Sequence, residues 1–364
     1  MYLILTQCFP SRVGGIESLV SNLALSIAKK KKVIVLADQH HIIYDSIYDN
    51  KYKDKLLIRR YRGFKYFRRR KKVSDLNLFI KSKKIELVIS DTWKSLELCV
   101  ENLNLNKIPV ICLAHGNELL PKNEVKKKRI MSTLNKSTSI VVNSNFTAKL
   151  VEKLIQDKTK IKVVHPGAND LRSIKADVSI RITGDPVLLT LSRIEKRKGH
   201  FIVLNALIKL KDIFPNILYV IAGDGDEKPN IVNFVKKNSL EKNVLFVGSV
   251  NENQKKQLFD YTSIMIMPTL DESINRSIEG FGISYIEAAF FGIPSIASNV
   301  GGTPEAVLHE KTGIIIENNH QLFDEIKNLL LNKNKLKILG DNAKERAEKM
   351  FIWDEVADRY LLIS

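Results

Sequence analysis

The fold is decided by the opening stretch of the chain, residues 1–37, which reads MYLILTQCFPSRVGGIESLVSNLALSIAKKKKVIVLA. Two apolar runs, Tyr2–Gln7 and Lys32–Ala37, flank a segment at Ile16–Lys30 whose apolar residues recur at helical spacing. Buried parallel strands read as continuous apolar runs, and a helix usually connects them. The stretch therefore predicts a strand–helix–strand unit of an α/β fold.

The same alternation continues along the chain. Further strands are predicted at Ile85–Ser90, Val110–His115, Ser139–Ser144 and Lys160–His165. After a polar pause at Pro166–Pro186 they resume at Val187–Ser192, Leu218–Ala222, Val244–Val247, Ser263–Met267, Pro294–Ser298 and Gly313–Glu317. We expect two doubly wound domains, residues 1–170 and 171–350, with a last helix in 351–364 that crosses back to the first domain. Ligands of such sheets bind beyond the carboxyl ends of the strands, so we expect the site in a cleft between the domains.

Composition narrows the class of protein. The 364 residues are 44% hydrophobic and 27% charged, which indicates a globular chain. No stretch reaches the roughly 18 apolar residues of a spanning helix, and Met1–Phe9 lacks the features of a signal peptide. Three cysteines without metal-ligand spacing favour a reducing compartment, so we expect a cytoplasmic protein.

The positive charge is confined to one half. The chain carries 58 Lys and Arg against 40 Asp and Glu, a net charge of +18. Residues 1–170 hold 33 of these basic and 15 of these acidic side chains, so the whole excess lies there. Such asymmetry indicates that this half meets a polyanion or an anionic surface.

The densest basic segment, Arg59–Lys72, mixes nine basic with four aromatic residues. We call its basic residues the basic patch: Arg59, Arg60, Arg62, Lys65, Arg68, Arg69, Arg70, Lys71 and Lys72. Basic and aromatic side chains together suit an anionic membrane face, and they suit nucleic acid equally well. The residues alone leave both alternatives open.

In the first half, two features follow predicted strands. Gly14 and Gly15 stand between the first strand and its helix, where a glycine pair lets the backbone approach a phosphate, although a tight turn explains it as well. The pattern is neither G-x-G-x-x-G nor a Walker A loop. His115 ends a strand and is a candidate for a functional histidine.

The second half holds the denser group. Arg193 and Lys198 follow the strand Val187–Ser192 and are placed to hold one anion. Between Glu279 and Glu287, a helix start brings the backbone N–H groups of Gly282, Ile283 and Ser284 together as an anion nest. Two carboxylates beside a phosphate cradle indicate a sugar nucleotide, since a carboxylate accepts hydrogen bonds from vicinal hydroxyls.

These motifs, in this order, resemble those of the family-4 retaining glycosyltransferases of the GT-B fold. The resemblance rests on Gly14-Gly15, on Arg193 and Lys198 in SRIEKRKG, and on the two glutamates eight positions apart. It extends to Gly223-Asp224-Gly225 and to Gly301–Glu305, and so covers nearly the whole chain.

The resemblance implies roles for these residues. Arg193 and Lys198 would hold the donor diphosphate, helped by the N–H groups of Gly15 and of Gly282, Ile283 and Ser284. Glu287 would bind the ribose and Glu279 would face the donor sugar, while His115 would lie near the reacting centre. No metal and no cofactor is expected, with the nucleotide sugar as substrate. The polar insertion Thr269–Ile278 borders the donor sugar, so the sugar is the least defined part of the transfer.

The expected function is transfer of a hexose, with retention, to a membrane lipid such as diacylglycerol or to a lipid-linked glycan. UDP-glucose or a similar UDP-hexose is the favoured donor, ahead of a GDP-mannose-dependent mannosyltransferase of lipopolysaccharide or phosphoinositol lipid. The resemblance favours the membrane over nucleic acid, and hence a peripheral protein of the inner membrane face. A nucleotide-sugar epimerase and a nucleic-acid-binding protein are the alternatives from other classes.

Overall fold

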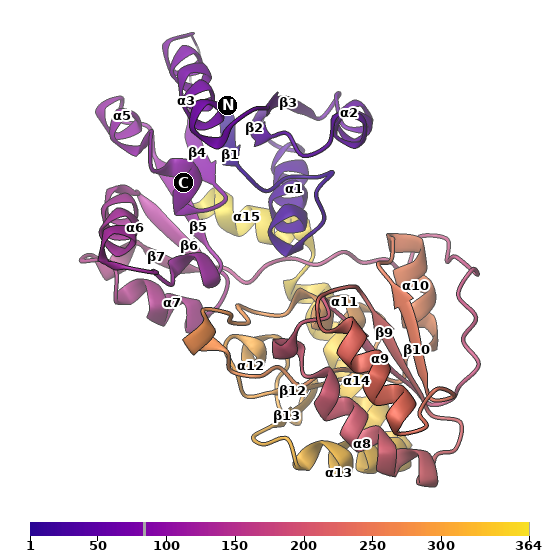
Figure 1. Cartoon of the computed structure of the whole chain (residues 1–364). Helices are drawn as coiled ribbons and strands as arrows, with labels where there is room; N and C mark the ends of the chain where they lie inside the picture. The colour runs from indigo at the N-terminus through magenta and orange to yellow at the C-terminus, as the bar shows by residue number, and fades with distance from the viewer. Residues whose placement is uncertain (83–84, 364) are drawn as a thin grey trace. The chain divides into compact units, whose positions relative to one another are not determined.

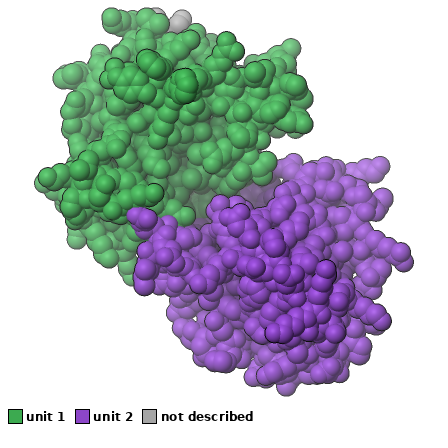
Figure 2. All heavy atoms as spheres, viewed as in Figure 1, with its two compact units in different colours: residues 1–167, 353–364 green, residues 168–352 purple. Residues whose placement is uncertain are grey.

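The computed structural model describes residues 1–82 and 85–363 and divides the chain into two compact units. Unit 1 comprises Met1–Gly167 and Trp353–Ser364, and unit 2 comprises Ala168–Ile352. Figure 2 colours the two units separately. The division falls within three residues of the boundaries expected at 170 and 350.

Unit 1 is built on a seven-stranded parallel sheet in the order β3-β2-β1-β4-β5-β6-β7 (Figure 1). Its strands are β1 (Tyr2–Thr6), β2 (Val33–Asp38), β3 (Leu56–Tyr61), β4 (Leu87–Ser90), β5 (Val110–Ala114), β6 (Ser139–Val142) and β7 (Ile161–Val163). Its helices are α1 (Gly15–Ile27), α2 (Ile42–Lys51), α3 (Lys65–Ser82), α4 (Trp93–Leu96), α5 (Val100–Leu105), α6 (Glu124–Lys136), α7 (Asn145–Glu152) and α15 (Trp353–Ile363), with 3-10 turns η1 (Asn117–Leu119) and η2 (Lys158–Lys160).

Helices cover both faces of this sheet. Alternate residues of β1 point to opposite faces, so Leu3 and Leu5 join one apolar cluster while Tyr2 and Ile4 join the other. The first cluster includes side chains of α3, α4 and α6, and the second includes those of α1 and α15. The last helix therefore belongs to the core of unit 1, and Lys29 of the α1 region pairs with Asp354 at 2.6 Å.

Unit 2 is built on a six-stranded parallel sheet in the order β10-β9-β8-β11-β12-β13. Its strands are β8 (Val187–Leu191), β9 (Leu218–Ala222), β10 (Val244–Gly248), β11 (Ile264–Met267), β12 (Ser295–Ser298) and β13 (Gly313–Ile316). Its helices are α8 (His200–Ile213), α9 (Lys228–Lys237), α10 (Glu252–Tyr261), α11 (Ile283–Phe290), α12 (Thr303–Ala306), α13 (Gln321–Leu331) and α14 (Lys333–Met350), with 3-10 turns η3 (Lys196–Lys198) and η4 (Ser273–Asn275).

Both sheets reverse their strand order once, between β1 and β4 in unit 1 and between β8 and β11 in unit 2. Loops leave the two strands at such a point in opposite directions, which opens a crevice at their carboxyl ends. The predicted fold class, two doubly wound parallel α/β domains, is confirmed.

One strand, β3, was not predicted from the sequence. β3 lies at the edge of the sheet, paired with β2, and buries only its end residues Leu56 and Tyr61. Because the middle of this strand carries Arg59 and Arg60, it has no continuous apolar run. From the sequence alone, this segment was therefore assigned only to the basic patch. In the structure the patch begins in β3 and continues into α3.

Candidate functional site

The charged residues of unit 2 gather at the switch point of its sheet, after β8 and β11. Arg197 and Lys198 lie on the turn η3, and the carboxylate of Glu279 lies 2.5 Å from Arg197 Nη1 and 2.5 Å from Lys198 Nζ. The three side chains are 6%, 11% and 13% exposed, respectively. Sequence reasoning predicted Lys198 and Glu279, but it missed Arg197, which lies among four consecutive charged residues.

A ladder of ion pairs extends from this cluster to Arg193. Glu195 Oε2 lies 3.6 Å from Arg197 Nη2, and its other oxygen lies 2.7 Å from Arg193 Nη1. The structure thus joins Arg193 to Lys198 through Glu195, Arg197 and Glu279. Three cations alternate with two carboxylates, which leaves a net positive charge for an incoming anion. The side chain of Arg193 is 71% exposed and is therefore accessible to such an anion.

Helix α11 starts beside this ladder. Its N-cap is Gly282, whose φ of 100° is unfavourable for other residues, and a Cβ there would lie 2.6 Å from the ring of Tyr285. The first N–H groups of a helix have no acceptor within the helix. Those of Gly282, Ile283 and Ser284 lie at the start of α11, where the sequence predicts an anion-binding nest.

Glu287 lies one turn into α11 and is buried. Its Oε1 accepts a hydrogen bond from Lys255 Nζ of α10 at 2.8 Å. Sequence reasoning missed Lys255, because nothing in the chain around it distinguishes it from other surface lysines. The pair would present both an acceptor and a donor to a polyhydroxylated ligand.

The glycine motif at 301–302 holds the backbone of Glu279. Gly302 N donates to Glu279 O at 2.9 Å, and a Cβ on Gly301, which has φ of 63°, would lie 2.2 Å from the same oxygen. This close approach requires glycine. The motif therefore positions the carboxylate that meets Arg197 and Lys198.

The predicted insertion Thr269–Ile278 is tied to the same cluster. Arg197 O accepts from Leu270 N at 2.8 Å, and Arg197 Nε donates to Ser277 Oγ at 3.0 Å. Both ends of the segment thus meet the residue that contacts Glu279, while Ile274 between them is exposed.

In unit 1, Gly14 and Gly15 form the start of α1. A Cβ on Gly15 would meet nothing within 4 Å, so the backbone there is open to a ligand. Beneath Gly14 lies the buried carboxylate of Glu17, which Arg12 Nε contacts at 2.9 Å.

Asp45 of α2 and Arg60 of β3 hold this loop in place. Asp45 is 1% exposed, and its carboxylate accepts hydrogen bonds from Ser11 N at 3.1 Å, Ser11 Oγ at 2.7 Å and His40 N at 2.8 Å. Burial alone would raise the pKa of Asp45, but the hydrogen bonds from Ser11 hold it below its usual value. Arg60 Nη2 donates to Pro10 O at 2.5 Å. Neither residue was predicted for the loop.

His115 follows β5 beside the switch point of unit 1. Its Nε2 lies 2.8 Å from Asp91 O, and since a carbonyl oxygen only accepts, Nε2 carries the hydrogen. In the tautomer with the hydrogen on Nε2, Nδ1 is the acceptor. Asp91 accepts from Thr6 Oγ1 at 2.9 Å and Gln7 N at 2.7 Å, and so joins the ends of β1 and β4.

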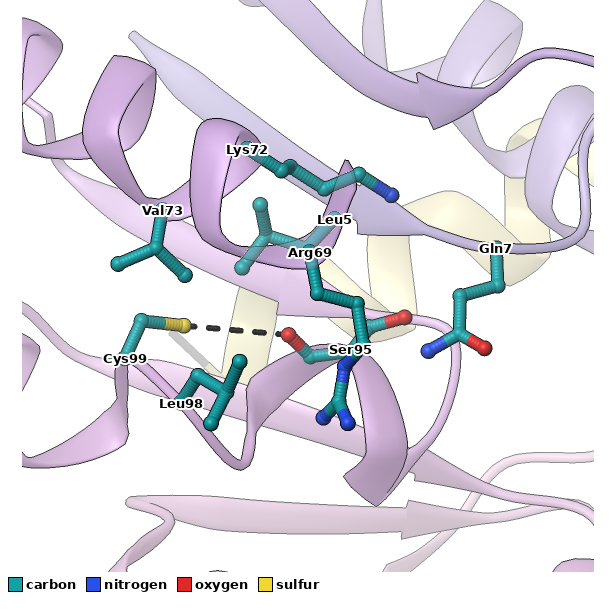
Figure 3. Close-up of a pocket in the computed structure, with 8 residues that line it drawn as sticks. All are labelled: Leu5, Gln7, Arg69, Lys72, Val73, Ser95, Leu98 and Cys99. Atoms are coloured by element: carbon teal, nitrogen blue, oxygen red, sulfur yellow. Dashed lines mark hydrogen bonds between the residues drawn. The ribbon is translucent and has the colours of Figure 1, made fainter. Parts of the chain in front are cut away.

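Figure 3 shows a small pocket in unit 1, lined by Leu5, Gln7, Arg69, Lys72, Val73, Ser95, Leu98 and Cys99. Its volume of about 10 Å³ is the space of one water molecule. Among the described residues, Gln7 Nε2 and Ser95 Oγ are buried without a hydrogen-bond partner. The pocket fits a bound water and is too small for a nucleotide.

The basic patch is not a continuous surface, and the prediction is wrong for its inward-facing members. Arg60 pairs with Asp49 at 2.6 Å, Arg69 with Glu97 at 2.9 Å, and Lys72 with Asp38 at 2.7 Å. Arg68 also lies 3.0 Å from Asp38. The exposed members are Arg59, Arg62, Lys65, Arg70 and Lys71.

Within α3, helical phase separates the two paired residues Arg69 and Lys72 from their exposed neighbours. Positions 69, 72, 76 and 79 lie on one side of α3, where Leu76 and Phe79 enter the core. Arg69 and Lys72 on that side pair with carboxylates, whereas Arg70 and Lys71 face solvent.

The part of the chain that the structure describes contains neither a candidate membrane-spanning helix nor a candidate metal-binding cluster. None of the helices within 1–82 and 85–363 combines the length and apolar character needed to cross a membrane. Over the same ranges, no group of three or more His, Cys, Asp or Glu side chains is arranged to hold a metal ion.

Known proteins match both units. Residues 13–171 match the family described as Glycosyltransferase Family 4, and residues 173–346 match Glycosyl transferases group 1. An uncharacterized glycosyltransferase of Methanocaldococcus jannaschii is 28% identical over 98% of this chain and 95% of its own length. A GDP-mannose-dependent alpha-(1-6)-phosphatidylinositol monomannoside mannosyltransferase of Mycobacterium tuberculosis is 23% identical over 68% of this chain and 67% of its own.

A solved structure supports the fold. The Anabaena protein HepE, crystallised with UDP, superposes with a TM-score of 0.80 at 17% identity, covering 99% of this chain and 98% of its own. With the two family matches, the chain belongs to the family-4 glycosyltransferases of the GT-B fold.

Proposed function

We propose that the protein transfers a hexose from a nucleoside-diphosphate sugar to a lipid-borne acceptor, with retention at the anomeric carbon. The observation that carries this proposal is the cluster of Arg197, Lys198 and Glu279 beside the start of α11. A net positive cluster next to free N–H groups suits a diphosphate, and Glu287 on the same helix suits a ribose.

In the overall transfer, the bond from the anomeric carbon to the phosphate oxygen breaks and its electron pair leaves with the nucleoside diphosphate. A bond from that carbon to the acceptor oxygen forms on the same face, and the proton of the acceptor hydroxyl passes to the departing phosphate. The negative charge that develops there is stabilised by Lys198, Arg193 and the start of α11. Glu279 would face the sugar. His115 would accept a hydrogen bond from a sugar hydroxyl through Nδ1. The proposal involves no metal and no cofactor.

Two donors follow from two observations. The resemblance of the motifs favours UDP-glucose or another UDP-hexose, whereas the Mycobacterium tuberculosis relative, as its name says, depends on GDP-mannose. Both donors present the same diphosphate to the cluster around Lys198. Selection between them therefore depends on contacts with the base and the sugar.

The lipid-borne acceptor is supported by the exposed part of α3 and the loop before it. Arg62, Lys65, Arg70 and Lys71 face solvent together with Phe64, Tyr66 and Phe67. Each basic side chain near an anionic membrane contributes about 1 kcal/mol. The Mycobacterium tuberculosis relative is also named for a phosphatidylinositol-based acceptor. We therefore place the protein at the cytoplasmic face of the membrane, as a peripheral enzyme of glycolipid synthesis.

The test is a screen of UDP- and GDP-hexoses with vesicles of mixed membrane lipids, followed by mass spectrometry of the lipid products. We expect a hexosylated lipid with one donor class. Arg193→Ala should lose most of the transfer, whereas Lys237→Ala, which removes another exposed basic side chain of unit 2, should retain it. Release of no nucleoside diphosphate from any donor would contradict the proposal, and equal flotation with anionic and zwitterionic vesicles would contradict the electrostatic docking.

A further inference from the structure

Helix α2 carries an apolar face that the core does not use. Ile42, Ile43, Tyr44 and Ile47 are 66%, 63%, 61% and 58% exposed, whereas Asp45 is the buried residue of the helix. Ile43 and Ile47 are one turn apart, so they lie on the same side of the helix, with Tyr44 next to them. A cluster of large apolar side chains on one helix face marks a site of interaction.

This apolar face begins at the same rim of the sheet as the exposed basic residues of α3. β2 ends at Asp38 and β3 at Tyr61, and these two residues are register partners in the parallel pair. Helix α2 starts four residues after Asp38, and α3 starts four residues after Tyr61. Arg68 in the first turn of α3 reaches back to Asp38 at 3.0 Å. Both helix starts therefore adjoin the carboxyl ends of β2 and β3.

The rim thus combines three kinds of side chain: aliphatic residues on α2, aromatic residues at Phe64, Tyr66 and Phe67, and cations at Arg62, Lys65, Arg70 and Lys71. Aliphatic side chains enter the acyl region of a bilayer, aromatic ones prefer its interface, and cations meet anionic headgroups. A second copy of the chain fits less well, because a symmetric contact would bring like charges together.

We infer that the apolar face of α2 inserts into the acyl region of an anionic membrane while the start of α3 contacts the headgroups. The inference rests on the proposed membrane docking and adds to it a penetrating element, which charge alone does not supply. It concerns Ile42, Ile43, Tyr44 and Ile47, all outside the basic patch.

Tryptophan placed on α2 reports the insertion. Ile43→Trp is mixed with vesicles of phosphatidylglycerol and phosphatidylcholine whose acyl chains carry bromine, a contact quencher of tryptophan fluorescence. Leu105→Trp is the matched control, since Leu105 is 83% exposed and ends α5, which precedes β5 and so lies at the opposite, amino-terminal rim. The wild type, with Trp93 and Trp353, gives the background.

We expect brominated vesicles to quench Ile43→Trp at least twofold more than Leu105→Trp. Equal quenching of the two would overturn the inference. Ile43→Ser combined with Ile47→Ser should lower vesicle partitioning about tenfold or more, because a tenfold change is about 1.4 kcal/mol and a buried isoleucine contributes that much. Unchanged partitioning, or a dimer in vesicle-free solution that this double variant abolishes, would likewise overturn it.

The proposed function can fail separately. The isoleucine variants should still hydrolyse the donor, or transfer its sugar to a soluble acceptor, at the wild-type rate. Their transfer of the sugar to a vesicle-borne acceptor should fall. If neither the wild type nor any variant uses a donor, the transferase proposal is wrong. The quenching experiment then still tests whether α2 inserts into the membrane.

Discussion

Replacing Glu279 by glutamine removes the carboxylate that both Arg197 and Lys198 contact. The two cations are 6% and 11% exposed, so they would remain inside unit 2 with no shared counter-ion. Removing one partner of a buried ion pair costs about 3–5 kcal/mol. Since Glu195 still lies 3.6 Å from Arg197, we expect the substitution to lower the free energy of unfolding by about 3 kcal/mol, the lower end of this range.

The assay is denaturant unfolding of the wild type and Glu279→Gln at neutral pH. Glu310→Gln is the matched control, because the pair of Glu310 with Lys335 at 2.9 Å is exposed and contributes about 0–1 kcal/mol. If Glu279→Gln costs no more than this control, the buried cluster is not formed in solution and the reasoning fails.

The pH dependence gives a second readout of the same substitution. Burial raises the pKa of Glu279, but the charges of Lys198 and Arg197 outweigh it and hold the pKa below the ordinary value of 4.5. A carboxylate with a lowered pKa stabilises the folded state above its unfolded-state pKa, and this stabilisation is lost as the pH falls through the folded-state value. The stability difference between wild type and Glu279→Gln should therefore be full above about pH 5 and shrink below pH 4.5. A difference that widens in acid would contradict this.

Three further substitutions test the site. Glu287→Ala should abolish most transfer while leaving the melting temperature within a few degrees of the wild type, and near-normal turnover would remove Glu287 from the site. His115→Ala should lower kcat at least about 100-fold, the range of general acid–base and positioning groups, with nucleoside-diphosphate binding by calorimetry unchanged; weakened binding instead would place His115 at the diphosphate. Asp45→Ala leaves the N–H groups of Ser11 and His40 without their acceptor, so thermal unfolding should show a loss of about 1–3 kcal/mol, and donor titration a higher KM. An unchanged KM would mean that the loop at Gly14 and Gly15 does not touch the donor.

The fold was predictable because its signal is local. Each buried parallel strand is a continuous apolar run, and the runs alternate with helical segments along the chain. β3 is the exception, since an edge strand that buries only Leu56 and Tyr61 carries no such run. This strand forms because it pairs with β2, and the sequence of a single segment does not show which other segment it will pair with.

The site was predictable where glycines and strand ends mark it, as for Gly282, Glu279 and Lys198. Arg197, Lys255 and Asp45 were not, because each acts through a contact with a residue distant in the chain: Arg197 with Glu279, Lys255 with Glu287 and Asp45 with Ser11.

The basic patch shows the same limit in another form. Composition alone treats all nine basic residues alike, whereas the helix turns Arg69 toward the carboxylate of Glu97 and Lys72 toward that of Asp38. The spacing of these two residues with Leu76 and Phe79 was the signal that could have separated them.

Hexose transfer with retention is tested by the anomeric configuration of the transferred hexose, measured by NMR on the lipid product made from an α-linked UDP- or GDP-hexose. We expect an α-linked product whose formation depends on Glu287 and Arg193. A β-linked product, or equal product from Glu287→Ala and the wild type, would contradict it.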